Sequence, residues 1–261
     1  MFVRTLGAIF SSGAICFVAL AGAQAAEKTP PAALLWVGNS FFYYNNSMHN
    51  FLLGFLRADG RTDARGTSVT VSGSGIEWHD MKSYLRPNGI GRYSFVGDNE
   101  IIFNKAGRQY DGVILMDCSQ CPVHPQLKNT FYRYARKHMQ TIRAYGAEPI
   151  LFMSWAYKDK PEMTQQLADA YGKAGAQNKM RVIPAGLAFA NAVKARPELE
   201  LYQRDKRHPS LAGTYLAAAT TYVILYGKSP VGSSFVSGLD APTATFLQKI
   251  AADTAEAYVR K

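Results

Sequence analysis

Short apolar runs alternate along this chain with longer segments in which apolar residues recur every three or four positions. Five of the runs have the length and composition of β-strands, and they cover residues 34–37, 68–72, 111–117, 149–154 and 181–184. The runs at 111–117 and 149–154 are almost continuously apolar, which is typical of strands that are covered on both faces. The pattern therefore predicts a buried sheet.

Helical patterns fill the segments between and after these runs. The expected helices cover residues 46–58, 76–85, 126–145, 162–178, 186–196, 210–227 and 241–259. Within 210–227, Leu211, Tyr215 and Ala219 form a stripe with helical spacing that must face a core. Alternating strands and helices indicate an α/β fold, in which a parallel sheet lies between two helical layers. The glycine-rich segment 86–110 is expected to be a long loop that could carry a hairpin.

The N-terminal segment has the features of a secretory signal peptide in their usual order. Arg4 is followed by an apolar stretch and then by the small-residue sequence Ala-Gln-Ala, so cleavage is expected after Ala25. An uncleaved membrane anchor is the alternative, but the apolar part is short for a bilayer span and small residues crowd its end. We therefore expect residues 1–25 to be removed and residues 26–261 to form one domain, periplasmic or secreted.

The positive charge of the chain does not by itself indicate a partner. The formal net charge is +10, and the Lys and Arg residues are scattered rather than clustered. No motif typical of nucleic-acid binding accompanies them, so a nucleic-acid partner is not expected. No segment after the N-terminal one is long and apolar enough to span a membrane, so no stable span is expected after cleavage.

Two polar segments follow the first and the last strand. The first strand ends in Gly38-Asn39-Ser40, where Gly38 is expected to allow a sharp turn, and the last strand is followed by Asp205-x-x-His208. A nucleophilic serine needs a base within hydrogen-bond reach and an acid that fixes the tautomer of that base. Because the carboxyl ends of parallel strands meet at one edge of the sheet, the two segments are expected to lie together.

These segments resemble the SGNH (GDSL-like) hydrolases, a superfamily of esterases, lipases and carbohydrate acetylhydrolases. The resemblance rests on "LLWVGNSF", in which Asn39 replaces the usual Asp, and on "DKRHPSLAGTYLAAATTYVILYG". It extends from residue 34 to about residue 230, and it implies a flavodoxin-like α/β/α sandwich with a five-stranded parallel sheet. It also implies that Ser40 is the nucleophile, that His208 is the general base and then the acid, and that Asp205 orients His208. Neither a metal nor a cofactor is implied.

The family stabilises the oxyanion with main-chain and side-chain donors from its middle motifs, and these match less closely. The resemblance implies Ser40 N–H as one donor and a glycine of "TVSGSGIEWHD" as the second. Gly75 is preferred to Gly73, which reads better as a loop glycine with positive φ. The third donor is usually an Asn, and in "VILMDCSQCPVH" the residue that aligns with it is Gln120.

Cys118 and Cys121 are the only cysteines outside the N-terminal segment. In an oxidising compartment such a pair is expected to form a disulfide. The spacing is also that of a thioredoxin-like redox motif, so a thiol-disulfide oxidoreductase remains an alternative function. With His124 the cysteines could suggest a metal site, but no fourth ligand is evident, and no metal is expected.

The remaining site assignments are candidates for the substrate cleft: Asn39, His79 and His124. The function favoured by the sequence is an exported serine hydrolase that cleaves an acyl or acetyl ester of a small molecule, glycan or lipid through an acyl-enzyme on Ser40. A binding module for an envelope polymer, on the same fold but without catalysis, is a further alternative. The sequence does not select a substrate among these classes.

Overall fold

The computed structural model describes residues 1–2, 30–97, 100–105 and 107–260, with the main chain alone for residues 94–97. The expected signal peptide therefore lies almost wholly outside the described residues. No helix in the part of the chain that is described is long and apolar enough to cross a membrane.

A five-stranded parallel sheet forms the centre of the molecule. Its order is β2-β1-β5-β6-β7, and every neighbouring pair is parallel. The strands are β1 (Ala33–Gly38), β2 (Arg65–Thr70), β5 (Gly112–Leu115), β6 (Glu148–Phe152) and β7 (Arg181–Ile183). The chain moves from β1 to β2 in one direction and from β5 to β7 in the other, which is the flavodoxin-like order. The predicted α/β fold class is confirmed.

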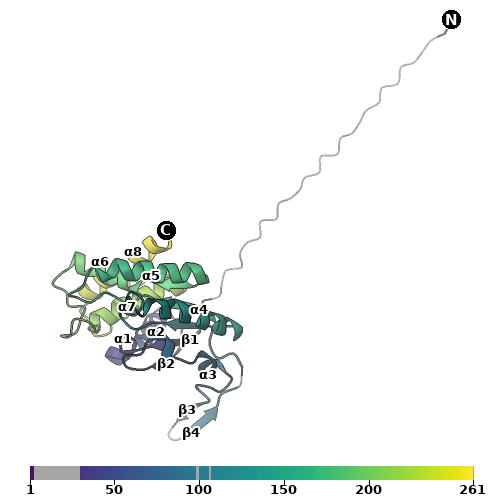
Figure 1. Cartoon of the computed structure of the whole chain (residues 1–261), viewed down its shortest axis with the longest axis horizontal. Coiled ribbons are helices and arrows are strands. Elements are labelled where there is room, and N and C mark those ends of the chain that lie inside the picture. Colours follow the sequence, from purple (N-terminus) through teal and green to yellow (C-terminus); the bar gives the residue numbers. More distant parts are fainter. Residues whose placement is uncertain (3–29, 98–99, 106, 261) are drawn as a thin grey trace.

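Helices cover both faces of this sheet (Figure 1). Crossovers between parallel strands are right-handed, so the connections that run in opposite directions place their helices on opposite faces. On one face α2 packs against α7, and α8 packs on α7; on the other face α4 packs against α3 and α5. These helices are α2 (Met48–Ala58), α3 (Met81–Leu85), α4 (Lys128–Ala144), α5 (Met163–Asn178), α7 (Leu211–Tyr226) and α8 (Ala241–Val259). Helix α6 (Ala185–Ala195) contacts α5, α7 and α8.

The segment between α3 and β5 contains a hairpin outside the main sheet. Strands β3 (Tyr93–Gly97) and β4 (Glu100–Phe103) pair with each other in antiparallel fashion. In Figure 1 this hairpin projects away from the rest of the fold. The described residues of the hairpin are exposed, so it adds little to the core.

Several expected element boundaries were wrong: the strand expected at 68–72, for example, is β2 at Arg65–Thr70. Three of the corrections have a local cause. The strand expected at 111–117 ends at Leu115, so that Asp117 lies in the following loop. The helix expected at 76–85 is a 3₁₀ turn, η2 (Ile76–Trp78), followed by α3, because His79 and Asp80 are extended and the Asp80 side chain caps α3. The helix expected from residue 46 begins at Met48, since the three preceding residues have positive φ.

Candidate active site

The turn after β1 presents Ser40 at the carboxyl edge of the sheet. Asn39 is extended and caps the short helix α1 (Ser40–Tyr43), with its Oδ1 accepting a hydrogen bond from Phe41 N at 3.2 Å. Gly38 does not have a positive φ, so the expected reason for a glycine at this position was wrong. A Cβ there would lie 3.0 Å from the Phe42 ring, which shows that the glycine allows Phe42 to pack against the end of the strand.

Ser40, His208 and Asp205 meet in one hydrogen-bonded series. Ser40 Oγ lies 2.8 Å from His208 Nε2. On the other side of the ring, His208 Nδ1 donates to Asp205 Oδ2. With its Nδ1 proton held by the carboxylate, the neutral imidazole presents Nε2 as an acceptor for the Ser40 hydroxyl. The two segments that the sequence placed at the same sheet edge are thus in contact.

Three hydrogen bonds fix the Asp205 carboxylate, one of them from the His208 imidazole. Its Oδ1 accepts from Arg207 N at 2.9 Å and from His208 N at 3.0 Å. Burial raises the pKa of Asp205, but these bonds and the bond from His208 outweigh it and hold the pKa below its usual value. The group is therefore ionised at neutral pH and can stabilise an imidazolium.

The loop that carries His208 is held by residues that the sequence did not single out. Trp155 Nε1 donates to Arg207 O at 2.9 Å, and the Tyr44 ring stacks on the His208 imidazole with centroids 4.2 Å apart. Asn45, whose φ is +54°, donates to the carbonyl oxygen of Pro209 at 3.0 Å. Tyr44 is the last of four consecutive aromatic residues after Ser40, and Phe42 in the same run packs on Phe152 in the core. The run is thus divided between core and site, which a pattern of four similar residues could not reveal.

Asn39 joins three loops that follow three neighbouring strands. Its Nδ2 donates to Ser74 O and to Asp117 O, each at 3.1 Å. Ser74 Oγ donates to Gly38 O at 3.0 Å and therefore accepts from His79 Nε2 at 3.1 Å. The Asn39 amide is buried and used by these carbonyls, so it positions the loops rather than presenting a polar group to a cleft.

No protein-family model matches the sequence. No curated protein matches it either. Solved structures do match over most of the chain, and one is a protein of the DUF4886 family from Bacteroides uniformis, with 18% identity, a TM-score of 0.60, and coverage of 88% of this chain and 96% of that one. A candidate SGNH hydrolase from Slackia heliotrinireducens has 21% identity and a TM-score of 0.56, over 74% of this chain and 97% of its own. An acetylxylan esterase from Geobacillus stearothermophilus has 13% identity and a TM-score of 0.54, over 77% and 97%.

The chain has the fold of the SGNH hydrolases. In this fold the loops after β2 and β5 flank the serine, and they contain the expected oxyanion residues. Gly75 is buried, and its N–H makes no hydrogen bond with another described residue. A buried main-chain N–H without a partner is rare, so the N–H of Gly75 is a candidate donor to a ligand. Gly73 has the positive φ expected of a loop glycine.

The third expected donor of the SGNH site, Gln120, lies in the turn between the two cysteines. Its carbonyl accepts from Val123 N and His124 N, at 3.0 and 2.8 Å. Its side-chain amide is half-buried and has no hydrogen-bond partner among the described residues. The assignment of Gln120 as a donor therefore stays a prediction.

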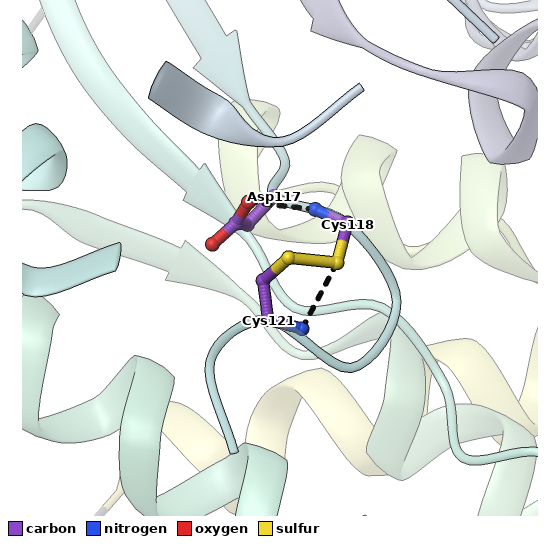
Figure 2. A group of neighbouring side chains, drawn as sticks. All are labelled: Asp117, Cys118 and Cys121. Carbon is purple, nitrogen blue, oxygen red and sulfur yellow. Dashed lines mark hydrogen bonds between the residues drawn. A yellow bond between two sulfur atoms is a disulfide. The ribbon is translucent and has the colours of Figure 1, made fainter. Parts of the chain in front are cut away.

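Cys118 and Cys121 form a disulfide in this loop (Figure 2). Together with the Asp117 carboxylate they are the residues that lie close enough to suggest a metal site in the described parts of the chain. Both sulfurs are used by the disulfide, so neither is the thiolate that a metal ion would require.

The other two histidines proposed for the cleft lie at different depths. His124 is half-buried, and its Nδ1 accepts from Gln126 N at 3.2 Å. His79 is buried, and desolvation together with the neighbouring His138 lowers its pKa to about 4. His79, His138 and the exposed Trp78 line a cavity of about 280 Å³ between η2 and α4.

Proposed function

We propose that this protein is an exported serine ester hydrolase that acts through an acyl-enzyme on Ser40. The observation that carries the proposal is the 2.8 Å contact between Ser40 Oγ and His208 Nε2, with Asp205 bonded to the far side of the ring. The sequence at the chain's N-terminus supports export, and the SGNH fold supports the reaction class. An acyl or acetyl ester of a small molecule, glycan or lipid is the proposed substrate.

Each residue of the site has a defined part in the proposed reaction. His208 Nε2 takes the proton as Ser40 Oγ attacks the ester carbonyl, and Asp205 stabilises the imidazolium that forms. The free N–H groups of Ser40 and Gly75 receive the negative charge that develops on the carbonyl oxygen, with Gln120 as the third proposed donor. His208 then protonates the leaving alcohol, and a water molecule activated by the same imidazole hydrolyses the acyl-enzyme. No metal or cofactor is required.

A fluorophosphonate probe tests the nucleophile directly. The chain from residue 26 should be labelled covalently and should hydrolyse p-nitrophenyl acetate, and Ser40→Ala should abolish both. Removing the serine or the histidine of such a triad typically costs about 10⁴–10⁶ in turnover. Ser234→Ala is a matched control, because Ser234 is exposed and makes no side-chain hydrogen bond with a described residue. Labelling that survives in Ser40→Ala would refute the proposal, and dithiol exchange that is indifferent to Ser40 would favour a thiol oxidoreductase.

A further inference from the structure

The carboxyl group of Asp117 is buried where the loops after β2 and β5 meet. Its side chain is only 1% exposed. Its Oδ1 accepts two main-chain hydrogen bonds, from Ile76 N at 2.8 Å and from Cys118 N at 2.7 Å. The bond to Cys118 and the adjacent disulfide are drawn in Figure 2. One oxygen atom therefore ties the two loops that flank Ser40.

The second oxygen of this carboxyl is unpaired. Asp117 Oδ2 is closed off from solvent and has no hydrogen-bond partner in the described parts of the chain. The pKa of Asp117 is raised to about 7, mainly by burial and to a smaller extent by the charge of Glu77. The two main-chain hydrogen bonds offset only part of this rise. Such a group disfavours the folded state when it is charged, which makes it a poor choice for stability alone.

The main-chain carbonyl of Asp117 is also linked to the loop after β2, through the side chain of Asn39. Asp117 O accepts from Asn39 Nδ2, and the other hydrogen of that amide is donated to Ser74 O. Gly75 thus lies between two anchored groups, the carbonyl of Ser74 before it and the N–H of Ile76 after it. Because the peptide bond between Ser74 and Gly75 is trans, holding the Ser74 carbonyl on one side points the Gly75 N–H to the other.

We propose that Asp117 is a positioning residue of the oxyanion site, an inference that rests on the proposed function. Its side chain holds Ile76 N–H, and its carbonyl holds Asn39, so that the free N–H of Gly75 stays aimed beside Ser40. Since Oδ2 is sealed from solvent, Asp117 acts through Gly75 and does not touch the substrate. The acceptor oxygen, rather than the negative charge, is the feature that this role requires.

Substitution of Asp117 by Ala and by Asn separates these two features. Asp117→Asn keeps an oxygen acceptor in the same place, and it should retain kcat for p-nitrophenyl acetate within about threefold. Asp117→Ala removes the acceptor and should lower kcat by about 100-fold with KM within about twofold, because a displaced donor weakens only the transition state. Asp240→Ala is the matched control: Asp240 also accepts from a main-chain N–H, that of Thr243 at 2.8 Å, but it caps the remote helix α8. It should leave kcat unchanged.

A third variant tests the same bond from the other side. Ile76 is the first residue of η2, a position at which proline is tolerated, so Ile76→Pro removes the donor and leaves Asp117 in place. Because the Ile76 side chain is buried in the core, Ile76→Ala, which keeps the N–H, is its matched control. Ile76→Pro should lower kcat as Asp117→Ala does, and the double variant should lose no more than either single one. This variant also decides the question if Asp117→Ala does not fold.

The outcomes distinguish this inference from the function on which it rests. An active wild type whose kcat is unaffected in Asp117→Ala and Ile76→Pro would overturn the positioning role alone. Equal loss of kcat in Asp117→Asn and Asp117→Ala would also overturn it, since the acceptor is present in one of them. A wild-type chain that is neither labelled by the fluorophosphonate probe nor able to hydrolyse the ester would overturn both.

Discussion

The buried carboxyl of Asp117 should make the stability of this protein depend on pH in a distinctive direction. Its pKa is about 7 in the folded protein and near the usual 3.8 in the unfolded chain, so the folded state binds the proton more tightly. The contribution of the neutral group is therefore fully present below pH 3.8 and is lost as the pH rises through 7. Substitution by Asn, which has no proton to lose, removes this dependence.

The size of this change in stability follows from the difference between the folded and unfolded pKa values of Asp117. Each unit of pKa is worth about 1.36 kcal/mol, and the two values differ by about three units, so the free energy of unfolding should change by about 4 kcal/mol. Asp117 is 1% exposed, so solvent screening does not reduce this figure greatly. The change is a large fraction of the stability of a typical domain.

Urea denaturation of the wild type and of Asp117→Asn, from pH 4 to pH 8 with the disulfide intact, measures this term. Groups common to both proteins cancel in the difference, including His79, whose burial lowers its pKa to about 4. The wild type should lose stability relative to the Asn variant by about 4 kcal/mol between pH 4 and pH 7, and the difference should be constant above that. Parallel pH curves would refute the reasoning, because they would mean that Oδ2 has a partner that favours its charge.

Four further substitutions test how the site and the fold around it are held. Asn45→Ala frees the main chain after His208 and should cost about 2 kcal/mol of stability and about 10-fold in kcat, and an unchanged kcat would show that this tie is dispensable. Trp155→Phe keeps the ring stack but loses one hydrogen bond to the same loop, and should cost about 1 kcal/mol in urea denaturation. Gly186→Ala places a Cβ 2.3 Å from a main-chain oxygen and should cost about 1–3 kcal/mol, whereas Gly172→Ala meets nothing within 4 Å and should add up to about 1 kcal/mol. Thermal unfolding of this last pair should therefore show shifts of opposite sign.

The sheet and the meeting of Ser40 with His208 could be predicted because both depend on local pattern and strand order. Apolar runs mark strands by their length, and parallel strands bring their carboxyl ends to one edge. The residues that support the site could not be predicted in this way. Asn45 bonds to Pro209, 164 residues further along the chain, and Trp155 bonds to Arg207, 52 residues further along, only because the fold brings them together. A single Asn or Trp in a sequence carries no sign of its partner.

The same limit applies to Asp117, which the apolar pattern predicts to lie inside a strand. Asp117 directly follows an apolar run in the sequence, which suggests that the strand continues through it. In the structure, β5 ends at Leu115. The carboxyl of Asp117 therefore lies at a junction of loops, where a buried acid has main-chain donors to accept from. A polar or charged residue that interrupts an apolar run at the end of a buried strand is therefore a candidate functional residue.

The hydrogen-bond partners of Asn39 and Asp117 explain why one is an amide and the other a carboxyl group. The resemblance to the SGNH hydrolases would place an Asp at position 39, but here that side chain faces two carbonyl oxygens, of Ser74 and Asp117. An ionised carboxylate has no proton to donate and would leave both acceptors unpaired in a buried place, whereas an amide satisfies both. At Asp117 the requirement is reversed, because Oδ1 faces two N–H donors. The donor amide of Asn39 and the acceptor oxygen of Asp117 thus form one junction. Loss of the donor at position 39 or of the acceptor at position 117 is expected to release the turn that carries Gly75.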